Sequence, residues 1–261
     1  MPFPAAIAAQ CQPPAAASVL VQVHDFMDLQ DAIDANLTDA EASREDAFTR
    51  LRVFLPAGPA LTLGRRHHDS LKHGNPCAFQ QSPGLLETVE RARQRGWPVI
   101  AADRGGEATA HLPGQVVAFV AAPMPRHRAS QLVGAMLSAA QQIAAQSGVQ
   151  TVVGEGAQAG LWTADGAKLA SIGLRWRGGV FTHGMALNVA VDPGLVEGLV
   201  LCGDAGAGYA SVRPPPPVAC ADGKPHEIKH PAPVDAGRAA ALRRTSRSLA
   251  GALARALAAV P

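Results

Sequence analysis

The order of apolar segments along this 261-residue chain limits its possible folds more than any other feature. Short apolar runs bounded by glycine and proline predict strands at residues 18–24, 52–55, 60–63, 98–102, 116–122, 150–153, 169–175, 179–182 and 185–191. Helical spacing predicts helices at residues 28–35, 39–48, 84–96 and 130–147, the last capped by Ser130 and ended by Gly148. Strands follow one another as in hairpins, with 52–55 and 60–63 as one such pair, and the helices are isolated. This pattern predicts an α+β fold and not a regular βαβ alternation.

Length and composition set the broad class of protein. Apolar residues make up 48% of the chain, enough for a substantial core, and the length fits one large domain or two small ones. Aromatic residues make up only 4%, which argues against a platform that stacks nucleic-acid bases. The formal charge of +2 gives no general attraction to nucleic acid or to a membrane. We therefore expect neither as a partner.

The cysteines and the N-terminal residues bear on the compartment. Cys11, Cys77, Cys202 and Cys220 show no Cys-x-x-Cys spacing, which favours free thiols in a reducing compartment. Residues 1–17 carry four prolines and no basic start, so we expect a flexible N-terminal extension and not a signal peptide. No uninterrupted apolar run approaches the roughly 18 residues of a membrane span. The protein is therefore expected to be cytoplasmic.

Two further parts complete the expected domain organisation. Residues 18–212 are expected to form the main domain, and residues 213–261 a proline-rich segment followed by a C-terminal helix. One face of that helix carries Leu242, Leu249, Leu253 and Leu257, and the arginines lie mostly on the other face. We expect the leucine face to pack on the main domain, and a helix lying on a membrane surface is the alternative.

A lysine and a cysteine each lie within a glycine-marked apolar segment. Lys168 is one of only four lysines in an arginine-rich chain, which suggests an amine that must titrate, as a guanidinium cannot. Cys202 follows Leu201 and precedes Gly203. A thiol paired with such an amine can carry out covalent acyl chemistry. Neither residue establishes this chemistry alone.

Three other features have a structural interpretation beside a functional one. In residues 104–115, paired glycines let a backbone approach a ligand, with Arg104, Thr109 and His111 on the same loop; an ordinary Gly/Pro turn is the alternative. His183 lies at the junction of two expected strands, where a histidine is more often a core or turn residue. Asn188 similarly fits a turn held by its side-chain amide.

Two segments resemble a dinucleotide-binding motif and a metal-ligand set, but neither fits the requirements of that site. The glycines of residues 154–160 follow a strand, but their spacing is wrong for a dinucleotide fingerprint. Cys220, His226 and His230 form an incomplete ligand set, and neighbouring prolines argue against the helix that would bring both imidazoles to one face. We expect no metal and no cofactor.

Taken in order, several segments resemble the lipoyl(octanoyl) transferase family. The matching pieces are Thr62-Leu63-Gly64-Arg65-Arg66, residues 104–115, Gly160-Leu161-Trp162, residues 168–175, residues 182–189, and Cys202-Gly203. They span about 140 residues in the family's order and with roughly its spacing. Six collinear segments are far more specific than any one of them.

The resemblance implies a biotin/lipoate protein ligase-like fold, a mixed β-sheet flanked by helices. Enzymes of this family move an octanoyl group from acyl carrier protein to a lysine of a lipoyl domain. The expected acceptors are the lipoyl domains of 2-oxoacid dehydrogenase complexes and the glycine cleavage H protein. By position, Cys202 would carry the acyl group as a thioester and Lys168 would act as acid and base, without ATP. Backbone N–H groups near Gly203 or His183 would hold the oxyanion.

The family's substrate-binding positions also transfer to this chain. They fall on Arg104, Gly105, Gly106, Thr109, His111, Gly114, Gln115, Ser171, Ile172, Gly173, His183, Gly184 and Ala186. Clusters of arginine, such as Arg65-Arg66 and Arg175/Arg177, are expected to meet an acidic partner protein, with a solvated basic face as the alternative.

This chain departs from the family pattern at two places. Ala110 and Leu112 stand where the family usually has tyrosine and glycine around the histidine, and Asp204 stands where it usually has isoleucine. A carboxylate close to the thiol would raise the pKa of the thiol. Two alternatives remain open: an ATP-dependent lipoate or biotin ligase of the same fold, and a relative that binds lipoyl or carrier domains without turnover.

Overall fold

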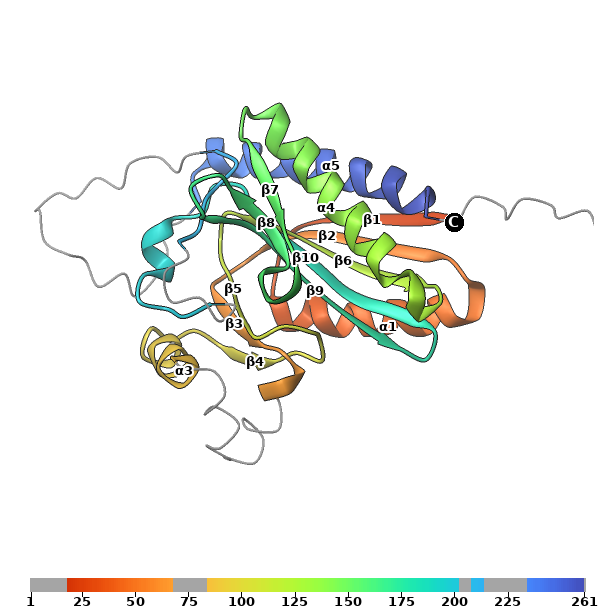
Figure 1. Ribbon diagram of the computed structural model, residues 1–261, viewed down its shortest axis with the longest axis horizontal. Coiled ribbons are helices and arrows are strands. Elements are labelled where there is room, and N and C mark those ends of the chain that lie inside the picture. The colour runs from red at the N-terminus through yellow and green to blue at the C-terminus, as the bar shows by residue number, and fades with distance from the viewer. Residues whose placement is uncertain (1–17, 68–83, 202–207, 214–233, 261) are drawn as a thin grey trace, which may run out of the picture.

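The computed structural model describes residues 18–67, 84–201, 208–213 and 234–260, and is built on a seven-stranded mixed sheet (Figure 1). The strand order is β1-β2-β6-β10-β9-β8-β7, with β1 parallel to β2 and the other neighbours antiparallel. The strands are β1 (Val19–Met27), β2 (Thr49–Pro56), β6 (Gln115–Pro123), β7 (Thr151–Gly154), β8 (Gly160–Thr163), β9 (Lys168–Arg177) and β10 (Val180–Asn188). A second sheet of order β4-β3-β5 consists of β4 (Val99–Ala101), β3 (Ala60–Leu63) and β5 (Ala108–His111).

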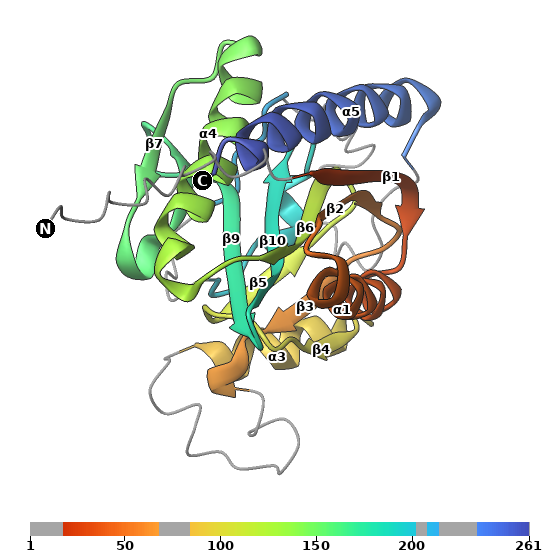
Figure 2. The ribbon, with the colours of Figure 1, turned by 90° about the vertical axis from the view of Figure 1, so that its right-hand side faces the viewer.

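Helices cover both faces of the large sheet (Figure 2). Helix α1 (Leu29–Asp46) lies against one face, while α4 (Ala129–Gln146) and α5 (Ala236–Ala258) lie against the other. Strand β6 shows how the sequence produces these layers, since side chains alternate across a strand. Val116 and Ala118 belong to the cluster that includes α4 and α5, whereas Val117 and Phe119 belong to the cluster that includes α1. Helix α3 (Leu85–Gln94) packs beside the small sheet.

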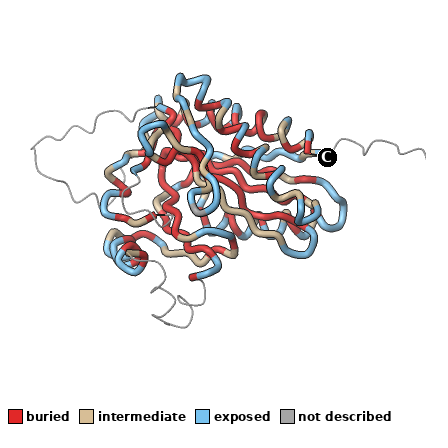
Figure 3. The backbone as a smooth tube through the Cα atoms, viewed as in Figure 1, coloured by how far each residue is buried: buried red, intermediate tan, exposed pale blue. Residues whose placement is uncertain are grey.

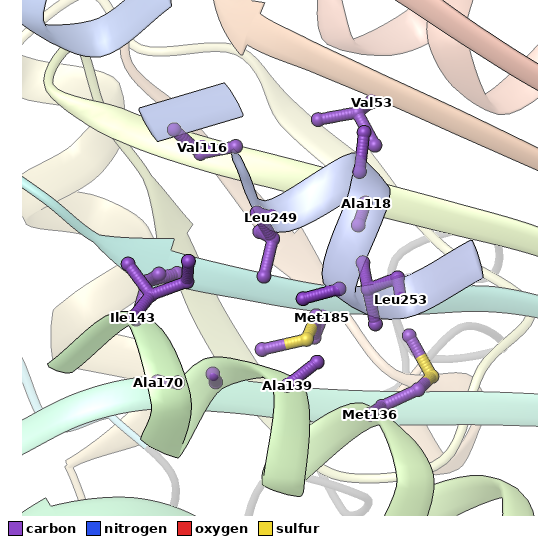
Figure 4. Packing of buried hydrophobic residues seen from close by; sticks show 14 of the residues in the cluster. Val53, Val116, Ala118, Met136, Ala139, Ile143, Ala170, Met185, Leu249 and Leu253 are labelled. Carbon is purple, nitrogen blue, oxygen red and sulfur yellow. The ribbon is translucent and has the colours of Figure 1, made fainter. Parts of the chain in front are cut away.

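The largest hydrophobic cluster joins the sheet to α4 and α5. Figure 4 shows Val53 and Ala118 of the sheet beside Met136 of α4 and Leu253 of α5. The four leucines singled out on the C-terminal helix are all nearly or fully buried in this cluster. Buried chain runs through the centre of the sheet, and exposed chain lies mainly on outer helix faces and connections (Figure 3). No helix in the described ranges is long and apolar enough to cross a membrane.

The α+β class with a mixed sheet between helices is confirmed, but several local predictions are wrong. In place of two helices at 28–35 and 39–48 there is the single helix α1, which ends at Asp46, because its buried face continues through Asn36 to Ala40 without a helix breaker. Ser130 is not the cap of α4: a 3₁₀ turn at Arg126–Arg128 leads directly into the helix, and no side chain caps it.

The expected strand pairs also rearrange. Residues 52–55 and 60–63 fall in different sheets, because β2 pairs with β1 and β6 while β3 pairs with β4 and β5. Residues 179–182 and part of 185–191 form the one strand β10, which passes through His183 without ending. Strands β5 and β8 were not expected; each is only four residues long and begins beside glycine-rich segments.

Gly184 is required by the close approach of β10 to β6. A Cβ atom there would lie 2.0 Å from the carbonyl oxygen of Ala118, a backbone atom that cannot move aside. We expect Gly184→Ala to lower the free energy of unfolding by about 1–3 kcal/mol or more. Gly134→Ala is the control, since Gly134 lies on an exposed helical position with open space around it, and it is expected to gain about 1 kcal/mol. Urea unfolding of both variants checks this; equal stability would contradict the steric argument.

Candidate active site

A narrow cavity, with only about 20 Å³ open to the centre of a water-sized sphere, lies where β9, β10 and the loop before β5 meet α1. Nine of the thirteen expected substrate-binding residues line it: Arg104, Thr109, His111, Ser171, Ile172, Gly173, His183, Gly184 and Ala186. The remaining lining residues are largely apolar: Ile33, Thr62, Ala102, Phe119 and Met185. Segments as distant in sequence as α1 and β10 therefore contribute to a single pocket.

Arg104 is the cation of this cavity, and its guanidinium is held from several directions. It is only 8% exposed. It donates to the carbonyl oxygen of Gly105 at 2.9 Å, and to the carbonyl oxygen and Oγ1 of Thr62 at 3.1 and 2.6 Å. Thr62 lies in the family-like segment before Gly64, so two of the matching motifs meet here. Fixed donors of this kind give a pocket a rigid polar wall.

Gly105, Gly106 and Gly114 do not line the cavity but allow the chain to turn around it. The amide of Gly105 donates to the carbonyl oxygen of Leu174 at 3.1 Å, which joins the loop to β9. Gly106 and Gly114 have φ values of +86° and +101°, which favour glycine. A Cβ atom on Gly114 would also lie 2.3 Å from the carbonyl oxygen of Ala190.

Gln115 is buried and hydrogen-bonded on all sides instead of facing the cavity. Its Oε1 accepts from the amide of Leu112 at 3.1 Å, and its Nε2 donates to Ala110 O at 3.1 Å and Asn188 Oδ1 at 2.9 Å. Asn188 Nδ2 then donates to the carbonyl oxygen of Lys168 at 2.9 Å. A buried polar chain thus runs from the loop to Lys168. Asn188 belongs to it and does not merely tie down a turn.

Leu112, the departure from the family pattern, does not enter the cavity. It is fully buried in the second hydrophobic cluster, together with Leu61 and Leu63 of β3. Its position therefore leaves the space of the cavity unchanged. Asp204, the other departure, lies outside the described residues.

Lys168 is buried at the start of β9 and is not among the residues that line the cavity. Its side chain is covered, since the residue is 3% exposed, and Nζ lies 4.6 Å from the centre of the Trp162 ring. That ring is fixed because Nε1 of Trp162 donates to the carbonyl oxygen of Gln158 at 2.7 Å. In the ranges that the structure describes, no carboxylate lies within 4.0 Å of this ammonium. An aromatic face is thus the counterpart of the charge.

Gly160 makes room for the lysine. Its φ of +146° favours glycine, and a Cβ atom there would lie 2.4 Å from the carbonyl oxygen of Ala170 and 3.2 Å from Cε of Lys168. Trp162 and Lys168 are partners across β8 and β9, where the pairing shifts by one residue. The Gly160-Leu161-Trp162 motif therefore leaves space for the Lys168 side chain and supplies the aromatic ring beside it.

Cys202, the expected partner of Lys168, lies outside the described residues. The chain on either side is described. Leu201 packs in the same hydrophobic cluster as Tyr209, and Tyr209 pairs with Lys168 in a parallel bridge. The amide of Lys168 donates to Gly208 O at 2.9 Å, and the amide of Ala210 donates to Lys168 O at 3.0 Å. The described chain that follows residue 207 thus lies directly beside the lysine.

Two buried histidines, His111 and His183, face the cavity in neutral form. Burial, followed by the positive charge of Arg104, lowers the pKa of His111 to about 3 and that of His183 to about 4. For His183, Asp103 raises the pKa slightly and Arg175 lowers it further. The pocket therefore contains one buried guanidinium and two uncharged imidazoles at neutral pH.

These depressed values predict an acid-sensitive fold. Between about pH 6.5 and pH 4 the unfolded chain binds protons that the folded histidines do not, so stability is full above pH 6.5 and is lost as pH falls. Each histidine contributes a slope of up to about 1.4 kcal/mol per pH unit. His183→Asn is expected to remove roughly half of this slope in urea unfolding at pH 7 to 5. His127→Asn, at an exposed histidine, is the control, and an unchanged slope in His183→Asn would contradict the prediction.

Asn36 is a residue of the site that the sequence analysis missed. It lies on the buried face of α1, 2% exposed, and its Oδ1 accepts the backbone N–H of His183 at 2.8 Å. The available signal was a polar residue within an apolar helical face, which includes Leu29, Ile33 and Ala40. The N–H of His183 is thereby occupied and is not free to hold an oxyanion, while Gly203, the other expected position, lies outside the described residues.

No metal site is evident in the described part of the chain, where no group of three or more His, Cys, Asp and Glu side chains could hold an ion. The set considered from the sequence, Cys220, His226 and His230, lies outside the described residues.

The fold is that of lipoate protein ligases. The protein Ta0514 from T. acidophilum, described as a putative lipoate protein ligase, aligns with a TM-score of 0.55 and 13% identity over 92% of this chain and 86% of its own. A lipoate-protein ligase A bound with ATP aligns with a TM-score of 0.53 and 14% identity, over 94% of each chain. At these identities the likeness concerns the fold alone.

Sequence places the chain more narrowly. The profile of the lipoyl protein ligase A/B catalytic domain matches residues 43–213, so the chain belongs to that family. An octanoyltransferase of Roseiflexus sp. is 31% identical over 195 residues, 72% of this chain and 74% of the relative. An octanoyltransferase of Marinobacter nauticus is 39% identical over 117 residues, 44% of this chain and 54% of the relative. The chain thus spans only about half the length of several curated relatives that it matches.

Proposed function

We propose that the protein is an octanoyltransferase that moves an octanoyl group from acyl carrier protein to a lysine of a lipoyl domain through a thioester on Cys202. The observation that carries the proposal is Lys168, buried against Trp162 and bonded by its backbone to the segment that follows Cys202. Curated relatives that are named octanoyltransferases support the same activity.

In the first step, the Cys202 thiolate attacks the thioester carbonyl of the octanoyl carrier. A new S–C bond forms to Cys202, the bond to the carrier sulfur breaks, and the carrier leaves as a thiol after taking up a proton. An ammonium on Lys168 near the sulfur favours the thiolate and can supply that proton. Because a thioester replaces a thioester, the acyl group stays activated and no ATP is consumed.

In the second step, the acceptor lysine attacks the acyl-Cys202 carbonyl. The amide N–C bond forms, the S–C bond breaks, and the attacking amine loses a proton. Lys168, left neutral by the first step, accepts that proton and is restored as the ammonium. Burial against the Trp162 ring holds the amine in place for both proton transfers.

The cavity is proposed to hold the acyl chain. Ile33, Phe119, Ile172 and Met185 supply apolar walls suited to an alkyl group. The imidazoles of His111 and His183, uncharged at neutral pH, add little desolvation cost beside it. On this proposal Gly105, Gly106, Gly114 and Gln115 act by shaping the loop.

The proposed partners are octanoyl-acyl carrier protein, the lipoyl domains of 2-oxoacid dehydrogenase complexes and the glycine cleavage H protein. Beside the cavity residue Arg104, Asp103 forms ion pairs with both Arg65 and Arg175, at 3.9 and 3.3 Å. Arg65 is 63% exposed, so this cluster offers a net positive charge to an acidic partner. Such charges act more on the rate of encounter than on the chemical step.

Incubation with octanoyl-acyl carrier protein, followed by intact-mass measurement, tests the proposal. We expect an octanoyl adduct to form without ATP and to pass to an added lipoyl domain. Modification of the lipoyl domain only with ATP and free octanoate would instead indicate a ligase. No modification by either route would favour a protein that binds these domains without turnover.

A further inference from the structure

The hydrogen-bond ladder between β10 and β6 is interrupted at His183. The two strands pair at Phe181–Ala122 and again at Gly184–Phe119, and the same register sets His183 opposite Val120. Pairing lapses at this position, where His183 has a φ of +65°, in the left-handed region that non-glycine residues rarely adopt. The interruption would leave a backbone N–H and a backbone carbonyl unpaired inside the sheet.

The carboxamide of Asn36 completes the interrupted ladder. Its Nδ2 donates to the carbonyl oxygen of Val120 at 2.9 Å, and its Oδ1 accepts the N–H of His183 at 2.8 Å. An amide is the side chain that can do both at once, since it offers one donor group and one acceptor in the geometry of a peptide. Asn36 thus takes the place of the direct bond between the two strands.

This insertion fixes where the His183 ring lies. The imidazole lines the cavity, with Nδ1 3.2 Å from Oγ1 of Thr182 and the ring 5.9 Å from that of Phe119, edge to face. Its Nε2 is buried and has no hydrogen-bond partner among the described residues. An extended backbone at His183 would send this side chain in a different direction, because the left-handed conformation rotates Cβ relative to the strand.

We propose that Asn36 is a positioning residue for the transfer reaction: it holds His183 in the left-handed conformation and so keeps the imidazole against the acyl cavity. The inference rests on the proposed function and deepens it. A misplaced cavity wall of this kind lowers turnover without removing any group that reacts.

The simpler role, docking α1 on the sheet, has a matched control in Ser43. Ser43 lies on the same buried face of α1, and its Oγ donates to the carbonyl oxygen of Ala121 at 3.3 Å, one residue along β6 from Val120. It makes no hydrogen bond to β10 among the described residues. Ser43→Ala therefore removes a comparable link between helix and sheet while leaving His183 alone.

The experiment compares Asn36→Leu, Asn36→Asp and Ser43→Ala by three measurements: melting temperature, the NMR chemical shifts of the His183 ring without any donor, and transfer kinetics. We expect Asn36→Leu to shift the His183 ring signals and to lower kcat/KM by about 10- to 100-fold. Asn36→Asp keeps an oxygen that accepts the His183 N–H but loses the donor to Val120, so it is expected to keep His183 signals and kinetics closer to wild type than Asn36→Leu does, at a cost in melting temperature. Ser43→Ala is expected to lose stability only. Should Asn36→Leu fail to fold, Asn36→Ala, which leaves room for a water between the strands, takes its place.

The inference is overturned if a folded Asn36→Leu or Asn36→Ala protein keeps wild-type His183 signals, or keeps wild-type kinetics. Failure of the proposed function has a different signature. In that case wild-type protein transfers no octanoyl group, while the His183 signals still report whether Asn36 sets the ring position.

Discussion

Replacing Cys202 with serine is expected to abolish octanoyl transfer, lowering kcat/KM by at least about 10³-fold, because the variant lacks the nucleophile on which both steps depend. A hydroxyl at this position has a far higher pKa than a thiol, so its attacking anion is scarce at neutral pH. An ester formed on serine would also be less reactive toward the acceptor amine than a thioester. Intact-mass measurement after incubation with octanoyl-acyl carrier protein should show no adduct.

Cys220→Ser is the matched control for this experiment, since it removes another thiol of the chain. It is expected to keep both the adduct and the rate of transfer. If Cys202→Ser protein still modified a lipoyl domain in the presence of ATP, the chain would be a ligase. Loss of the adduct in Cys220→Ser would instead indicate that Cys220 carries the acyl group, which would contradict the proposal.

Replacing Lys168 with arginine is expected to lower turnover by about 10²- to 10⁴-fold while leaving the fold intact. A guanidinium keeps the positive charge and can lie over the Trp162 ring as an ammonium does, so the packing and the electrostatic support are retained. It cannot give up a proton near neutral pH, so it cannot accept one from the attacking amine. Single-turnover kinetics of the isolated acyl-enzyme with a lipoyl domain measure this step directly.

The control is Lys229→Arg, the same substitution at another of the four lysines. Melting temperatures of the two variants should agree with wild type within a few degrees. A Lys168→Arg protein that transfers at the wild-type rate would remove the acid/base role. A protein that forms the adduct normally but fails to pass it on would locate the role of the lysine in the second step.

Local periodicity predicts much of the fold. The four leucines on the C-terminal helix repeat at helical spacing and are buried, and the run at residues 116–122 lies within the central strand β6. In each of these elements, the residues that predict the element all lie within it. The prediction failed where the deciding contact lay outside the segment, as when the 3₁₀ turn at Arg126–Arg128 displaced Ser130 from the cap position.

The candidate site shows the same division. Nine of the expected substrate-binding residues line the cavity, and all nine lie in the segments that carry the family resemblance. Asn36 lies outside these segments. Its two hydrogen-bond partners are 84 and 147 residues away in the sequence, and a single asparagine in a helix does not predict such distant contacts. The same holds for Asn188, whose link to Lys168 joins two strands that only the fold makes neighbours. Cys202 stays a prediction.

Helix α5 lies beyond the segment that matches the family profile, which ends at residue 213. The hydrophobic core extends beyond that residue, since Leu249 and Leu253 of α5 lie in the same cluster as Val53 and Ala118 (Figure 4). A polypeptide that ended at residue 213 would expose these core residues of the sheet to water. The segment that matches the family profile is therefore smaller than the folded unit, whose hydrophobic core includes α5.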